Sequence, residues 1–177
     1  MELKIVDADD RELPQDGIAS GELVVRADGV MKGYWNQPDA TAEVFRGGWF
    51  HTGDVATINQ EGYVLIVDRK KDMILSGGEN IASLEVERVI LGHPAILEAA
   101  VIPVPDQKWG EVPKALVVLR EGASVTESEL IQFCRSQLAH YKCPHTVEVV
   151  DSLPKTGTGK VLKKNLRKQY APATAPN

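Results

Sequence analysis

The segment Pro154-Lys155-Thr156-Gly157-Thr158-Gly159-Lys160 has the residue types that could bring a cation to an anionic ligand. A lysine on a flexible, glycine-bearing loop can enter a cleft and place its ammonium against phosphate or carboxylate oxygens. The segment is not a phosphate-wrapping P-loop, because a proline stands at position 154 and Val161 follows Lys160. Every charged side chain from residue 154 to 170 is basic: Lys155, Lys160, Lys163, Lys164, Arg167 and Lys168. Taken alone, such a run more often forms a solvated tail.

A second candidate site combines a carboxylate with an arginine. Asp54 follows Gly53 in His51-Thr52-Gly53-Asp54, which is typical of a tight turn that projects the carboxylate. One carboxylate can accept hydrogen bonds from both neighbouring hydroxyls of a ribose. Arg69 follows a predicted strand and carries a fork of donors suited to hydroxyls or phosphate. Taken alone, the aspartate more often bonds its own backbone, and the arginine more often forms a surface ion pair.

A third candidate is the stretch from Ser76 to Ile81, which is expected to join a strand to a helix. Its paired glycines, Gly77 and Gly78, would let a narrow ligand or another backbone pass closely, although an ordinary turn is equally consistent with them. Trp109 would usually pack in a core, and an exposed tryptophan there could line a ligand channel.

The composition restricts the class of protein. The chain has 177 residues, 43% hydrophobic and 25% charged, as expected of a soluble globular protein with one domain or two small ones. The net charge is −5, so the basic segment lies on an acidic molecule, which favours a local anion site over a nucleic-acid surface. No apolar run could span a membrane and no signal peptide is present, which predicts a cytoplasmic location. The two cysteines and four histidines have neither disulfide nor metal-ligand spacing, so no metal site is predicted.

The hydrophobic pattern predicts an α+β protein with two parts. Residues 3–67 favour short strands separated by turns, with a long aromatic-rich loop from residue 31 to 54. The second part favours a small, mostly antiparallel sheet with helices packed on it. Its predicted strands are 73–75, 99–104, 115–119 and 147–150. Its predicted helices begin at an N-cap Ser83, at the capping box Thr126 to Glu129, and at Val161.

The highly charged segment Asp68-Arg69-Lys70-Lys71-Asp72 is the expected boundary. We expect it to be exposed and to make few contacts, so that relative motion costs least there. The predicted domains are residues 1–68, residues 69–170 and a frayed tail at 171–177.

Taken in order, the motifs resemble the C-terminal third of the adenylate-forming superfamily, which comprises acyl-CoA synthetases, peptide-synthetase adenylation domains and beetle luciferases. The matching segments are Gly33–Thr41, Gly48–Asp54, Asp68–Ile74, Ser76–Ile81 and Pro154–Lys160. The resemblance runs from about Leu3 to Arg167 and is closest to fatty-acid or aryl acyl-CoA ligases. It implies part of a β-barrel subdomain followed by a small, mobile α+β lid with an antiparallel sheet flanked by helices.

The resemblance also implies roles for individual residues. Lys160 would be the adenylation lysine. Asp54 would hold the ribose hydroxyls of ATP and of the acyl-adenylate, assisted by Arg69. Lys71 would be the hinge about which the lid turns.

Four further residues would line the channel for CoA: Gly77, Gly78, Trp109 and Tyr141. Cys143 and His145 depart from the pattern, because some family members have more basic residues there.

The resemblance implies an AMP-forming acid-thiol ligase that uses ATP, Mg²⁺ and CoA in its full-length form. The chain lacks the family's phosphate loop, adenine pocket and acyl pocket, so we expect it to be inactive alone and to hold none of these ligands tightly. Its expected partners are the N-terminal adenylation core, a small carboxylate and CoA, without nucleic acid, and its exposed barrel edge would permit self-association. Two alternatives stay open: an adenylation domain serving a carrier protein, and a stand-alone nucleotide-, CoA- or partner-binding module.

Overall fold

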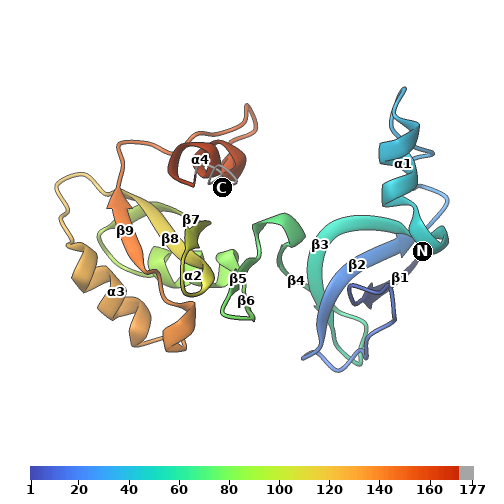
Figure 1. The fold of residues 1–177 in the computed structure, drawn as a ribbon, viewed down its shortest axis with the longest axis horizontal. Coiled ribbons are helices and arrows are strands. Elements are labelled where there is room, and N and C mark those ends of the chain that lie inside the picture. Colours follow the sequence, from blue (N-terminus) through green and yellow to red (C-terminus); the bar gives the residue numbers. More distant parts are fainter. Residues whose placement is uncertain (172–177) are drawn as a thin grey trace. The chain divides into compact units, whose positions relative to one another are not determined.

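The computed structural model describes residues 1–171, which divide into two compact units, residues 1–71 and the described residues from Asp72 onward. Figure 1 shows strands β1 to β4 and helix α1 in the first unit, and strands β5 to β9 and helices α2 to α4 in the second. This composition confirms the predicted α+β fold class.

The first unit is an open antiparallel sheet with its strands in chain order. Strands β1 (Glu2–Val6), β2 (Ser20–Arg26), β3 (Phe50–Ile58) and β4 (Val64–Arg69) pair successively. The β2–β3 connection contains helix α1 (Pro38–Val44) and the 3₁₀ turn η1 (Arg46–Gly48). Ile5, Ala56 and Ile58 form the buried core of this unit. No pairing within residues 1–171 closes the sheet into a barrel.

The second unit has a five-stranded sheet with its strands in the order β6-β5-β8-β7, and β9 also pairs with β8. Its strands are β5 (Ile74–Ser76), β6 (Glu79–Ile81), β7 (Ile96–Asp106), β8 (Gly110–Leu119) and β9 (Thr146–Val149). Its helices are α2 (Ser83–Leu91), α3 (Glu127–Arg135) and α4 (Lys163–Tyr170). The sheet is antiparallel except for the parallel β8–β9 pair.

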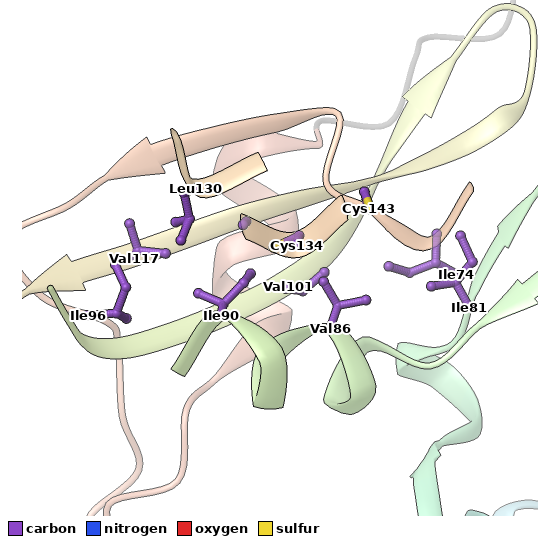
Figure 2. Packing of buried hydrophobic residues seen from close by; sticks show 11 residues of the cluster. Ile74, Ile81, Val86, Ile90, Ile96, Val101, Val117, Leu130, Cys134 and Cys143 are labelled. Carbon is purple, nitrogen blue, oxygen red and sulfur yellow. The ribbon is translucent and has the colours of Figure 1, made fainter. Parts of the chain in front are cut away.

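Both faces of the β7–β8 hairpin are buried, which explains its continuous apolar sequence. On one face, Val101 and Val117 pack with residues of α2 and α3, among them Val86 and Leu130 (Figure 2). On the other face, neighbouring strand residues pack against Leu166 of α4. The side chains alternate between the two faces because successive strand residues point in opposite directions.

Several helix and strand ends differ from their predicted positions. The capping box at Thr126 and Glu129 is confirmed. Ser83 is not an N-cap, however, because Ala82 occupies that position and Ser83 is the first residue of α2. The hydroxyl of Ser83 instead accepts a hydrogen bond from Lys163 Nζ at 2.7 Å. Strand β6 and helix α1 were not predicted.

The prediction of an exposed segment at residues 68–72 is wrong for its two acids. Asp68 is 1% exposed and Asp72 is 8% exposed. Asp68 Oδ1 accepts the backbone N–H of Arg69 at 2.7 Å, and Asp72 forms an ion pair with Arg167 of α4. Burial is tolerated because each carboxylate has a partner. The predicted frayed tail, apart from Ala171, lies outside the described residues.

Candidate functional site

Asp54 and Arg69 lie opposite each other on β3 and β4. Arg69 Nε is 2.6 Å from Asp54 Oδ1, and their side chains are 54% and 25% exposed. The first unit therefore brings together the two residues predicted to bind a ribose. The pair leaves Asp54 accessible, so its carboxylate can accept hydrogen bonds from a ligand.

The backbone around Asp54 is a bulged strand and not the predicted turn. The β2–β3 register shifts between Glu22 and Val24, and Gly53 has φ +73°. Thr52 fixes the bulge, because its hydroxyl donates to the carbonyl of Leu23 at 2.8 Å and accepts the N–H of Asp54 at 3.1 Å. A bulge re-aims the side chains of a strand, and a glycine at positive φ makes that geometry accessible.

A buried polar cluster next to this strand was not found by sequence reasoning. Glu22 and His51 are 8% and 7% exposed. Glu22 Oε2 lies 2.8 Å from Lys70 Nζ, 3.2 Å from His51 Nδ1 and 3.7 Å from Arg46 Nη2. Burial opposes ionisation of Glu22, but the hydrogen bonds from Lys70 and His51 hold its pKa below the ordinary value. The partners are 29 and 48 positions away in the chain, so no local pattern could reveal them.

The predicted hinge residue, Lys71, is exposed and lies in the 3₁₀ turn η2 (Lys70–Asp72). Its two neighbours are held by different units: Lys70 pairs with Glu22 of the first, and Asp72 pairs with Arg167 of the second. Lys71 itself has no ion pair with any residue from 1 to 171.

The second unit contains a pocket of about 550 Å³. Three of the residues predicted to line the CoA channel, Gly77, Trp109 and Tyr141, are among those that line it. Trp109 is 43% exposed and Tyr141 is 45% exposed, so both rings can meet a ligand. Gly78 lies in the same β5–β6 turn as Gly77 but is not part of the lining.

Gly77 is required for the close approach of Trp109 to this turn. Gly77 has φ +58°, and its N–H donates to the carbonyl of Trp109 at 2.8 Å. A Cβ at position 77 would lie 2.7 Å from Trp109 Cε3, which is closer than carbon atoms can pack. The glycine therefore allows the indole ring to cover the turn at the edge of the pocket.

The pocket also contains basic side chains, of which Arg135 and His140 were not singled out in the sequence. Its lining includes Arg135 of α3, His140 of the 3₁₀ turn η3 (His140–Lys142) and His145. Aromatic faces together with an arginine and histidines suit a ligand that combines flat rings with phosphate. Cys143 lines the pocket too, but it is 3% exposed and burial raises the pKa of its thiol.

Lys160 lies in the connection between β9 and α4 and does not belong to the pocket. A bridge between Lys155 and Val161 closes its loop into a hairpin. Within it, the N–H of Thr156 donates to the carbonyl of Lys160 at 2.8 Å, and the N–H of Lys160 donates to the hydroxyl of Thr156 at 3.1 Å. The loop is therefore more ordered than its glycines suggest. Lys160 is exposed and has no ion pair with another described residue.

No three or more histidine, cysteine, aspartate or glutamate side chains in the described part of the chain are grouped so that they could hold a metal ion. Among residues 1–171, no helix combines the length and apolar character that a membrane span requires.

Residues 85–160 match the family described as the AMP-binding enzyme C-terminal domain. The chain is 54% identical over 150 residues to a feruloyl-CoA synthase from Amycolatopsis sp., which covers 85% of this chain and 30% of that enzyme. It is 46% identical over 171 residues to the long-chain-fatty-acid–CoA ligase FadD13 of Mycobacterium tuberculosis, covering 97% of this chain and 33% of that enzyme. The chain thus spans about a third of the length of the curated relatives it matches.

Solved structures of similar enzymes have the same fold. The ATP-bound MatB from Rhodopseudomonas palustris matches with a TM-score of 0.91 and 38% identity, over 97% of this chain and 34% of that one. The o-succinylbenzoate CoA synthetase MenE from Bacillus subtilis, in complex with an acyl-adenylate intermediate, matches with a TM-score of 0.85 and 40% identity, over 94% of this chain and 33% of that one.

Proposed function

This chain belongs to the AMP-binding enzymes and contains their C-terminal domain. We propose that it is the C-terminal part of an ATP-dependent acyl-CoA ligase. Such an enzyme first joins a carboxylate to the α-phosphate of ATP, releasing pyrophosphate. The thiol of CoA then attacks the acyl-adenylate, giving a thioester and AMP. The pocket that contains Gly77, Trp109 and Tyr141 carries this proposal, because it would admit a thiol ligand with flat and phosphorylated parts.

In the first step, Lys160 would oppose the negative charge that accumulates when a carboxylate attacks a phosphate. Its exposed ammonium has no ion pair within residues 1–171, so no carboxylate of that part of the chain would have to be displaced. A preorganised cation acts most strongly where water is excluded, and losing one such contact typically costs about a hundredfold or more in rate.

Asp54 would hold the nucleotide through both ribose hydroxyls. The ion pair with Arg69 orients its carboxylate before the ligand arrives, which reduces the ordering that binding must impose. The side chain of Arg69 is 54% exposed, so its remaining N–H groups can still reach a hydroxyl or a phosphate oxygen.

Within residues 1–171, no group of three or more acidic, histidine or cysteine side chains could hold Mg²⁺ through the protein alone. Mg²⁺ usually binds through one or two carboxylates together with the phosphates of a nucleotide. We therefore assign no step to Mg²⁺ in this chain, and expect it to accompany ATP elsewhere in the enzyme.

For the second step, the pocket of the second unit would receive the pantetheine and nucleotide of CoA. The cation of the first step and the thiol channel of the second belong to the same unit, so a turn of that unit about Lys71 would present them in succession. Gating of this kind commonly separates the steps of an enzyme.

We further propose that the 177 residues alone are inactive, since the family's glycine-rich phosphate loop is not in the sequence and the resemblance assigns the adenine and acyl pockets to the N-terminal core. We also propose that the protein acts in the cytoplasm. The remaining enzyme is then the main partner. The free edge strand β4 exposes Leu65 and Ile66, which are 61% and 43% exposed, and would permit self-association when that partner is absent.

A chimera tests this function. The corresponding third of the feruloyl-CoA synthase from Amycolatopsis would be replaced by this chain, and AMP release and feruloyl-CoA formation would be measured. We expect both products. Lys160→Gln should lower adenylation about a hundredfold or more.

Lys164→Gln is the matched control, because Lys164 is an exposed lysine of the same basic segment that has no ion pair within residues 1–171. It should leave the rate unchanged. An unaltered rate for Lys160→Gln would contradict the proposed function.

A further inference from the structure

The basic segment near the C-terminus is not uniform. Lys155, Lys163 and Arg167 form ion pairs with acids of the second unit. Lys160, Lys164 and Lys168 form none with residues 1–171. The cations on the two sides of the hairpin are therefore neutralised, and the hairpin between them holds one lysine that is free of carboxylates in this range.

One side of the hairpin is held at its first lysine. Lys155 Nζ lies 2.7 Å from Glu98 Oε1, on strand β7. The two side chains are 40% and 30% exposed, so solvent screens this contact and it is the weaker of the two anchors.

The other side is held by a mostly buried network. Lys163 Nζ lies 2.6 Å from Glu87 Oε1 and donates to the hydroxyl of Ser83 at 2.7 Å. Glu87 Oε1 also accepts the N–H of Val101 at 2.7 Å, which joins α4, α2 and β7 at one point. The side chains of Lys163 and Glu87 are 12% and 11% exposed, so this anchor is the stronger one.

We propose that Lys155 and Lys163 are positioning residues for Lys160. Their ion pairs hold the ends of the hairpin on β7 and α2, and the hydrogen bonds between Thr156 and Lys160 carry that order to the tip. The ammonium of Lys160 then lies on a hairpin that is already ordered, so less conformational entropy of this loop is lost when the reaction takes place. Because Lys155 and Lys163 are neutralised, they do not compete with Lys160 for an anion.

The role of the hairpin rests on the proposed function, but the order of its backbone can be measured without an enzyme assay. In the 177-residue chain, ¹⁵N relaxation gives order parameters for the amides of residues 156–160. We expect order parameters of about 0.85 in the wild type, as in rigid backbone. Glu98→Lys should lower them, and the exchanged pair Glu98→Lys with Lys155→Glu should restore them.

Lys163→Gln should lower the same order parameters more than Glu98→Lys does. Lys164→Gln, which removes an exposed neighbouring charge, should leave them unchanged. If Lys163→Gln prevents folding, the exposed Glu98–Lys155 pair decides the question. Wild-type values below about 0.6, or values that neither anchor variant changes, would overturn the proposal.

Activity of the chimera separates this inference from the proposed function. Glu98→Lys should lower the kcat of adenylation by less than the loss of Lys160 does and leave the KM for ATP unchanged, and the exchanged pair should restore kcat. If Lys160→Gln has no effect on the chimera while the order parameters respond as expected, the anchors exist but the proposed function is wrong. A normal kcat for Glu98→Lys, despite lowered order parameters in the hairpin, would contradict the positioning role of Lys155.

Discussion

Asp54 and Arg69 are partners across β3 and β4, and their side chains form an ion pair of 2.6 Å. Arg69 Nε approaches Oδ1 of Asp54, and the aspartate side chain is 25% exposed, so that a ligand can reach it. A carboxylate fixed in this way is ready to accept hydroxyl donors, and the arginine is held beside it. The two side chains therefore depend on each other, because removal of either one would release the other from its present orientation.

Asp54→Ala should raise the KM for ATP of the chimera more than it lowers kcat, since ribose contacts are made in both the ground state and the transition state. A hydrogen bond to a charged group contributes about 1.5–3 kcal/mol, so we expect an increase of roughly tenfold to a hundredfold. Initial rates over a range of ATP concentrations measure it. Asp28→Ala, at an exposed aspartate of the same unit, is the control. Equal KM values for the two variants would remove Asp54 from the nucleotide site.

The structure places Asp54 beside Arg69, as the resemblance implied, but the backbone at Asp54 differs from the predicted turn. Gly53 and Asp54 are typical turn residues, but a bulged strand uses glycine at positive φ for the same reason, and local pattern cannot separate the two. The capping box of α3 was predicted correctly because its two residues are close in the chain and interact directly. Interactions between residues that are close in the chain can therefore be predicted from the sequence.

Contacts between distant residues could not be predicted. Lys163 reaches Ser83 across 80 positions, and Lys155 reaches Glu98 across 57. The sequence therefore indicated a uniformly basic segment from residue 154 to 170, whereas ion pairs in the fold neutralise part of it. Likewise, Arg135 joined the candidate pocket only because α3 lies beside the segment that contains Tyr141.

Gly77→Ala should destabilise the second unit and displace Trp109. The new Cβ would lie 2.7 Å from the indole, and alanine at φ +58° adds a backbone cost of about 1–2 kcal/mol. Gly78→Ala is the matched control: Gly78 has φ +89°, but a Cβ added there would have no other atom within 4 Å, so it should carry only the backbone cost. Urea unfolding of both variants gives the comparison.

The double variant Gly77→Ala with Trp109→Ala isolates the steric part. If the indole causes the clash, the effect of Gly77→Ala should become smaller in the Trp109→Ala background, approaching that of Gly78→Ala. If the two substitutions change the free energy of unfolding additively, the ring moves away freely. The close packing of Gly77 against Trp109 would then not affect stability.

Arg135→Gln should raise the KM for CoA in thioester formation and leave the KM for ATP unchanged. Arg135 lines the pocket with His140 and His145, where it could donate to a phosphate. Loss of a charge-assisted hydrogen bond predicts an increase of about tenfold or more. Arg120→Gln, at an exposed arginine of the same unit, should be silent.

Dephospho-CoA makes the test of Arg135 more specific. If Arg135 binds the phosphate of the CoA ribose, the wild type should prefer CoA over dephospho-CoA, and Arg135→Gln should reduce that preference. An unchanged preference together with a raised KM would assign Arg135 to a different part of CoA. No change in either quantity would exclude it from the pocket's function.

Cys134 should make the stability of the protein depend on alkaline pH. It is fully buried, and burial raises the pKa of its thiol from 9.0 to about 11. The unfolded chain then releases this proton near pH 9, whereas the folded chain retains it until about pH 11. The stability from this group is complete below pH 9 and is lost as the pH rises to about 11, by up to about 3 kcal/mol.

The comparison with Cys134→Ala isolates this contribution, because the other titrating groups are present in both proteins. Urea unfolding under reducing conditions at several pH values gives the difference in free energy of unfolding. The wild type should be the more stable protein near neutral pH, since alanine leaves a small cavity in the core around α3. That advantage should shrink between pH 9 and about 11 as the unfolded thiol ionises. A difference that stays constant over this interval would show that the thiol ionises equally easily in both states, and that the packing around Cys134 does not exclude water.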